Sequence, residues 1–70
     1  MRHALVAAVD LGAGSWAEVL LGSDDSYRIL VHQPIEEADG VAWETSTVFG
    51  PYSLLEEVEA RLEALREVEA

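Results

Sequence analysis

Four glutamates near the end of the chain have the type and spacing best suited to binding: Glu56, Glu59, Glu63 and Glu67. On an α-helix, spacings of three and four residues place side chains on one face, about 5–6 Å apart along the axis. Phosphates along a nucleic-acid strand are spaced similarly. The row therefore predicts binding to a basic protein surface, such as that of a nucleic-acid-binding protein. The alternative is a solvated helix face without a partner.

Two further acids, Asp24 and Asp25, lie in a predicted loop over 22–26, and we expect them to extend the partner-binding surface. The acidic loops do not have the alternating ligand spacing of a calcium-binding EF-hand. His3 is expected in a loose terminus and His32 at a strand end, and the chain has no cysteine to act as a nucleophile or zinc ligand. We therefore expect no catalytic residue, no metal site and no cofactor, and predict that the protein is not an enzyme.

The composition narrows the choice of partner. The 70 residues include 14 Asp and Glu against four basic residues, giving a formal net charge of −10. This charge disfavours direct binding to nucleic acid or to an anionic membrane, and no apolar run reaches the roughly 18 residues of a membrane span. We expect a cytoplasmic protein with a single domain over 1–70. Because so small a domain buries little of its surface, we also expect a homodimer.

A glycine-rich turn follows the first predicted strand, in the stretch Val9-Asp10-Leu11-Gly12-Ala13-Gly14-Ser15. This stretch resembles the first phosphate loop of the actin-like ATPases and sugar kinases. The resemblance to bacterial rhamnulokinases extends to Asp39-Gly40-Val41-Ala42-Trp43-Glu44. It implies that Asp10, Gly12 and Ser15 are the phosphate-binding residues, with Asp10 serving the metal-bound phosphates. A plain hairpin turn is the alternative interpretation.

A C-terminal helix is predicted over 53–68. Ser53 and Glu56 have the spacing of a capping box. Pro51 disfavours helix at Gly50 and places the start of the helix just after Pro51 itself. Six apolar residues recur at helical spacing and form the expected core face: Leu54, Leu55, Val58, Leu62, Leu65 and Val68. The glutamate row lies on the opposite face, so the helix should cover another element through its apolar stripe.

Four strands are predicted before the helix, over 4–10, 16–21, 27–32 and 41–49. Pro34 is expected to end the third strand, and the polar stretch 36–40 is expected to connect it to the fourth. The predicted fold is therefore α+β, with a small antiparallel sheet of three to four strands covered by one C-terminal helix.

Side-chain alternation predicts which residues of the fourth strand share a face: Val41, Trp43, Thr45, Thr47 and Phe49. The aromatic residues leave two interpretations open. They are either the core of the domain, or Trp16 and Trp43 are exposed as anchors of an interface.

These observations favour a non-enzymatic acidic protein that occupies a basic surface of a nucleic-acid-binding protein. Phage-type inhibitors, including anti-CRISPR proteins, often have this size and charge, which is an analogy of class and not of motif. One alternative is an N-terminal fragment or relative of an actin-like sugar kinase that uses 9–15 to bind phosphate. Another is a homodimerising domain with no ligand.

Overall fold

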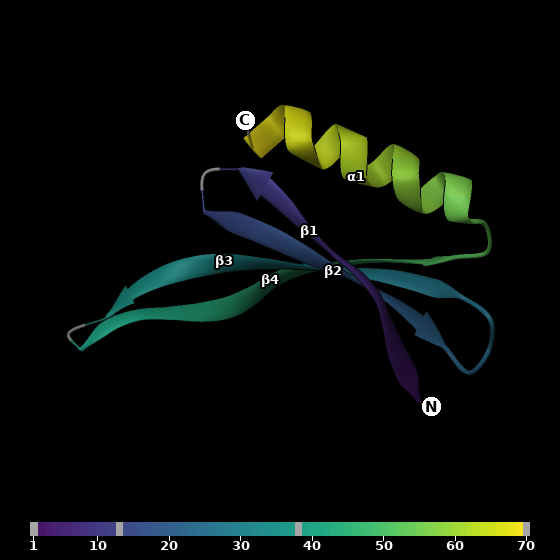
Figure 1. Ribbon diagram of the computed structural model, residues 1–70, viewed down its shortest axis with the longest axis horizontal. Helices are drawn as coiled ribbons and strands as arrows, with labels where there is room; N and C mark the ends of the chain where they lie inside the picture. The colour runs from purple at the N-terminus through teal and green to yellow at the C-terminus, as the bar shows by residue number, and fades with distance from the viewer. Residues whose placement is uncertain (1, 13, 38, 70) are drawn as a thin grey trace.

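The computed structural model contains four strands and one helix. It describes residues 2–12, 14–37 and 39–69. Within these ranges it describes all side chains except those at 36, 37, 41, 43, 46, 68 and 69. The elements are β1 (His3–Gly12), β2 (Ser15–Gly22), β3 (Tyr27–Glu37), β4 (Gly40–Tyr52) and α1 (Leu55–Glu69). The strands make one antiparallel sheet in the order β1-β2-β3-β4, and α1 lies across one of its faces (Figure 1). The predicted α+β fold is confirmed.

The core lies between the sheet and α1. Strand alternation directs Ala17 and Val19 of β2, and Ile29 and Val31 of β3, toward the helix, and each is at most 3% exposed. Val58 of α1 packs against them and is 1% exposed. This layer is small, as expected for a short chain whose surface is large relative to its volume.

The helix meets the sheet through a narrower stripe than predicted. Val58 is buried, and Leu62 and Leu65 are half-buried against the core. Leu54 and Leu55 were predicted on the core face but are 57% and 47% exposed. They stand at the start of the helix, directly after the chain has left β4. The Val68 side chain lies outside the described residues.

The start of α1 also differs from the prediction. The helix begins at Leu55, and the Glu57 N–H donates to the Leu54 carbonyl oxygen at 3.1 Å. Ser53 therefore precedes the first turn, and within the described part of the chain it makes no capping hydrogen bond. The predicted capping box is wrong. No helix in the described ranges combines the length and apolarity needed to cross a membrane.

The third and fourth strands extend beyond their predicted ends. β3 continues through Pro34, and the expected connection over 36–40 is mostly strand, since Glu37 pairs with Gly40. Past His32, which pairs with Trp16 at the start of β2, β3 has only β4 as a neighbour. Proline is tolerated in such an edge strand because its missing N–H is not required on the open side. β3 and β4 thus form a two-stranded arm beyond the sheet (Figure 1).

An irregularity in β4 breaks the predicted alternation. Thr45 pairs with His32, and Thr47 pairs with Val31, so β4 has one extra residue between consecutive partners. Such a bulge changes which face the following side chains occupy. Phe49 therefore packs on the core side, whereas Thr45 lies on the opposite side. The predicted common face is wrong for this pair, and the Trp43 side chain lies outside the described residues.

A close backbone approach requires glycine at the next irregularity of β4. Gly50 has φ +116°, and a Cβ at this position would lie 2.8 Å from the carbonyl oxygen of Tyr27. A residue with a side chain would be strained by its φ and would also clash with backbone that cannot move aside. Gly50 thereby allows the end of β4 to stay against β3 before the chain turns into α1.

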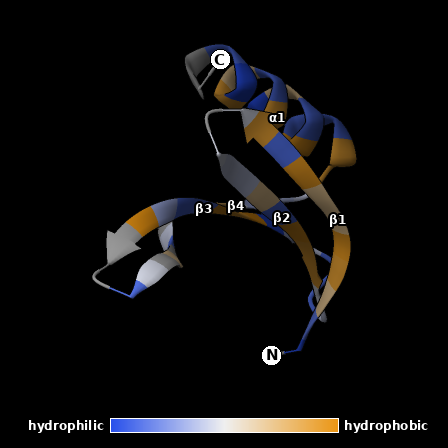
Figure 2. Ribbon diagram, turned by 60° about the vertical axis from the view of Figure 1, so that its left-hand side comes forward, coloured by the Kyte–Doolittle hydropathy of each residue, from blue (hydrophilic) through white to orange (hydrophobic). Residues whose placement is uncertain are grey.

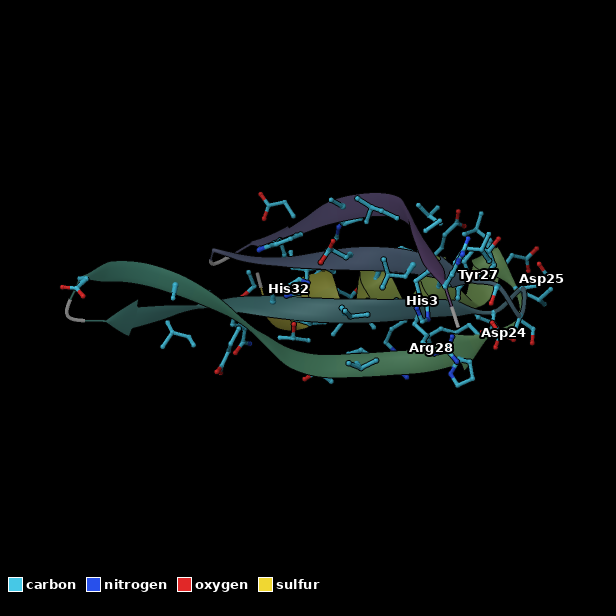
Figure 3. All side chains as sticks on the ribbon, turned by 90° about the horizontal axis from the view of Figure 1, so that it is seen from below. His3, Asp24, Asp25, Tyr27, Arg28 and His32 are labelled. Carbon is cyan, nitrogen blue, oxygen red and sulfur yellow. The ribbon has the colours of Figure 1, made fainter. Side chains whose placement is uncertain are left out.

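The sheet has a second face that α1 does not cover, here called the helix-free face. Its members follow from the pairing of residues across the strands. They include His3, Leu5, Ala8, Asp10, Trp16, Glu18, Leu20, Arg28, Leu30, His32, Thr45 and Val48. Figure 3 views the sheet from this side, with α1 behind the strands.

We predict that the helix is held mainly by Val58. Val58→Ala removes two methyl groups from a fully buried site and should lower the free energy of unfolding by about 2 kcal/mol. Leu55→Ala is the matched control. Because Leu55 is 47% exposed, this substitution should change the free energy of unfolding little. Urea denaturation followed by circular dichroism measures both. Equal stability of the two variants would contradict this account of helix packing.

Candidate partner-binding surfaces

The glutamate row forms an exposed surface on α1. Glu56, Glu59, Glu63 and Glu67 all have exposed side chains, and none forms an ion pair with another described residue. Figure 2 shows hydrophilic and hydrophobic residues alternating around the helix, as expected when one face packs on a sheet and the other meets solvent. The geometry of the predicted row is present, and its role in binding remains a prediction.

One arginine of α1, Arg61, turns toward the sheet. The Arg61 Nε donates to the Tyr52 hydroxyl at 3.2 Å, and its guanidinium carbon lies 4.9 Å from the centre of the Phe49 ring. Such a cation–π contact stabilises by about 0.5–1 kcal/mol at an exposed site. The positive charge of Arg61 is therefore used to attach α1 to β4 and does not form an ion pair with the row.

The row borders a shallow surface feature. Glu59 and Glu63, together with Leu62 and Arg66, line an open hollow of about 360 Å³. Leu62 gives the hollow an apolar floor next to the two carboxylates. Small-molecule sites are usually enclosed clefts that bury most of the ligand, so this arrangement is better suited to a side chain of a protein partner.

The predicted acidic loop is largely occupied by its own hydrogen bonds. The Asp24 carboxylate accepts from the Ser26 hydroxyl at 2.7 Å and from the Ser26 N–H at 3.2 Å, and Arg28 lies 3.7 Å away (Figure 3). These bonds, the hydroxyl's above all, hold the pKa of Asp24 below its usual range. Asp25 is exposed and has φ 63°. The loop therefore presents Asp25 freely, whereas Asp24 mainly orders the turn.

The loop and the row are separate surfaces. Figure 1 places the β2–β3 turn at one end of the sheet and α1 across the sheet's upper face. Among the described residues, no group of three metal-ligating side chains comes together. The other acids that the sequence placed in a loop, Glu36 and Glu37, have side chains outside the described part.

The glycine-rich stretch forms the β1–β2 hairpin. Gly12 pairs with Ser15, and Gly12 and Gly14 have φ of 87° and 82°. The exposed Asp10 carboxylate accepts from the Gly12 N–H at 2.9 Å. Ser15 is only 4% exposed and lies on the core side, so its hydroxyl is not presented to solvent. Of the three residues implied by the kinase resemblance, the structure thus brings Asp10 and Gly12 together and directs Ser15 inward.

One polar cluster was missed by the sequence analysis. His32 was predicted at a strand end but lies within β3, where its Nε2 is 2.7 Å from Glu18 and its Nδ1 is 3.1 Å from the Thr45 hydroxyl. Its ring stacks on Trp16, with the ring centres 4.4 Å apart. Trp16 is therefore a half-exposed residue of the helix-free face and not part of the core.

The hydrogen-bond roles in this cluster follow from its chemistry. A carboxylate only accepts, so the His32 Nε2 carries the proton shared with Glu18. With a neutral ring, Nδ1 then accepts from the Thr45 hydroxyl. The order of hydroxyl, imidazole and carboxylate resembles that of a hydrolase triad, and the three residues come from the paired strands β2, β3 and β4. The bonds satisfy polar groups of all three residues on the surface of the sheet.

His3 also has a defined position. It was predicted in a loose terminus but lies in β1, paired with Gly22, and its Nε2 is 3.5 Å from the Arg28 Nη1. Arg28 in turn donates to the Ser26 hydroxyl at 3.1 Å. The start of β1 is therefore linked to the β2–β3 turn through Arg28.

We predict that Ser26 controls the acid sensitivity of this turn. Ser26→Ala removes the strongest hydrogen bond to Asp24 and should raise its pKa toward the ordinary value, measured by NMR titration of the carboxyl carbon. Because the folded pKa is lowered, the turn's contribution to stability is present above the ordinary pKa of Asp and is lost as pH falls through the lowered one. Ser23→Ala is the control and should leave the Asp24 titration unchanged. The same titration in both variants would refute the assigned cause.

Comparison with known proteins adds no homologue to this picture. No family model, curated protein or solved structure matches the chain. The functional argument therefore depends on the charge, exposure and hydrogen bonding of the surfaces described above.

Proposed function

We propose that this chain is a non-enzymatic binding protein that meets a basic protein surface through the glutamate row of α1. The observation that carries the proposal is the exposure of four carboxylates on one helix, none with an ion-pair partner among the described residues. Unpaired carboxylates at helical spacing create a strong local negative potential. A surface that binds nucleic-acid phosphates has the complementary charge, so the proposed partner is a cytoplasmic nucleic-acid-binding protein.

The mode of action that follows from this partner is competition. A protein that occupies a basic groove excludes the nucleic acid that the groove would otherwise bind, and the result is inhibition of the kind exerted by phage-type inhibitors such as anti-CRISPR proteins. Complementary charges chiefly accelerate association and select the partner. The apolar floor at Leu62 would add a short-range contact beside Glu59 and Glu63. Asp25 is too far along the sheet to belong to the same contact and would provide a second, weaker one.

The row can be tested by reversing its charge. Replacing Glu59, Glu63 and Glu67 with Lys changes the net charge by six units, from −10 to −4, at exposed positions. Stability should change by no more than about 0.5 kcal/mol per site. Binding to the partner recovered by affinity capture should be lost, mainly through slower association in surface plasmon resonance. Wild-type binding should weaken steeply with salt, and the partner's own nucleic acid should compete with it.

A matched pair of variants separates the row from net charge. Glu59→Lys with Glu63→Lys changes the net charge by the same amount as Asp39→Lys with Glu44→Lys, whose sites are exposed on the β3–β4 arm. The first pair should weaken binding far more than the second. If the triple variant binds as well as wild type at both low and high salt, the row is only a solvated face.

A second candidate function is phosphate binding by the β1–β2 hairpin, in a fragment or relative of an actin-like sugar kinase. The observation that favours it is the exposed Asp10 beside two glycines with positive φ, a turn in which backbone can approach a ligand closely. However, the Asp10 carboxylate is already bonded to the Gly12 N–H. A bound magnesium ion would have to compete with that bond.

We predict that the hairpin alone does not hold a nucleotide. Calorimetric titration with magnesium–ATP should show no micromolar binding, because a single turn offers too few contacts to offset the lost freedom of the ligand. Micromolar binding that disappears in Asp10→Ala, and persists in the exposed control Asp39→Ala, would instead favour the kinase relationship.

A further inference from the structure

The helix-free face carries large apolar side chains that nothing in the described part of the chain covers. Leu5 pairs with Leu20, and Leu30 pairs with Val48. Leu5 and Val48 are 59% and 58% exposed, values that are high for residues of this type on a sheet. Leu20 and Leu30 lie on the central strands β2 and β3, so the apolar surface extends from one edge of the sheet to the other.

The polar groups at the centre of this face are satisfied within the protein, whereas the charged Asp10 and Arg28 lie toward opposite ends of it. Glu18 lies at its centre, between Ala8 and Leu30, and is held by His32 at 2.7 Å. His32 also bonds Thr45, and Trp16 covers its ring. A charged group that is paired and hydrogen-bonded can be removed from water at much lower cost than an isolated one. The cluster is therefore compatible with a covered interface.

Six of the 14 acidic residues lie on α1, on the other side of the sheet. The glutamate row lies on the outer side of α1, away from the sheet, whereas the middle of the helix-free face carries only the paired Glu18. Two copies that met through their helix-free faces would direct both helices outward. Stacked sheets lie about 10 Å apart, and each helix lies beyond its own sheet. The two rows would then be separated by more than the Debye length of about 8 Å at physiological salt.

We propose that the helix-free face is the interface of a homodimer in which a second copy packs sheet against sheet. The helix-free face spans the longest and the shortest dimensions of the protein, 40 and 15 Å (Figure 3), enough to bury the roughly 500 Å² per partner that a specific interface needs if most of the face is covered. A second copy suits the site because the centre of the face is apolar around the paired Glu18 and offers a basic or acidic partner no free charge. This inference is independent of the role of the glutamate row.

Two single substitutions test the interface at opposite edges of the sheet. Leu5→Lys on β1 and Val48→Lys on β4 alter side chains that are already mostly exposed, so the protomer should fold as before by circular dichroism. Each should weaken dimerisation by at least about tenfold in sedimentation equilibrium. Both substitutions reduce the net negative charge, so general electrostatics alone would strengthen association. Weaker dimerisation in either variant would therefore indicate that the substituted side chain is buried in the interface.

One substitution on α1 serves as the control for the two on the sheet. Ala64→Lys adds the same charge on the exposed side of α1 and should leave the dimer intact or slightly strengthened. A wild-type chain that remains monomeric at high micromolar concentration would overturn the proposal. So would a dimer weakened by only one of the two substitutions, since an edge-to-edge dimer would use β1 or β4 but not both. A dimer disrupted by Ala64→Lys alone would place the interface on the helix.

Discussion

A β-sheet has two faces, and this chain has a single helix to cover them. Every buried residue of β2 and β3 points to the side of α1, where Val58 closes the core. The helix cannot reach the other side, so the apolar residues there stay in water unless a partner covers them. That asymmetry leaves two surfaces available to partners: the outer side of the helix and the uncovered side of the sheet.

The two surfaces differ in the physics they can use. The outer side of α1 offers charge with little apolar area, which favours rapid, salt-sensitive encounter with a basic partner. The helix-free face offers apolar area around the paired Glu18, which favours slower-dissociating contact. Because the surfaces lie on opposite sides of the molecule, with the sheet and the body of the helix between them (Figure 1), occupation of one does not block the other. A face-to-face dimer would present two glutamate rows, and a partner with two basic sites would bind it with increased avidity.

The fold was largely predictable because each element carries a local signal. Glycine-rich or polar turns separate the strands, and apolar residues at helical spacing mark α1. The predictions that were wrong concern residues whose structure depends on neighbouring strands. Pro34 is tolerated because β2 does not extend to that part of β3, and Leu55 is 47% exposed although its spacing places it on the apolar stripe. The bulge in β4 follows from its pairing with β3 and has no signature in β4 itself.

The glutamate row was predictable as a surface for the same reason, since helical spacing alone places its members on one face. The polar cluster was not, although a signal existed. A turn centred on Asp24 brings Trp16 opposite His32 and places Glu18 one pair further along the same face. The contribution of Thr45 depends on the bulge in β4 and could not be predicted from the sequence. These residues differ from the row because they come from three strands, and only the register unites them.

The meander has a kinetic consequence. Each strand pairs with the strand before it in the chain, so the sheet closes through short loops, and such topologies fold quickly for β proteins. The helix is the exception, because it must return across the sheet to reach β1 and, among its described side chains, only Val58 is fully buried. We therefore expect the helix to behave as the least stable cooperative unit, detaching while the sheet persists. Detachment would expose Ile29 and Val31 for as long as it lasts, which makes the apolar underside of the helix a safeguard against aggregation as well as a source of stability.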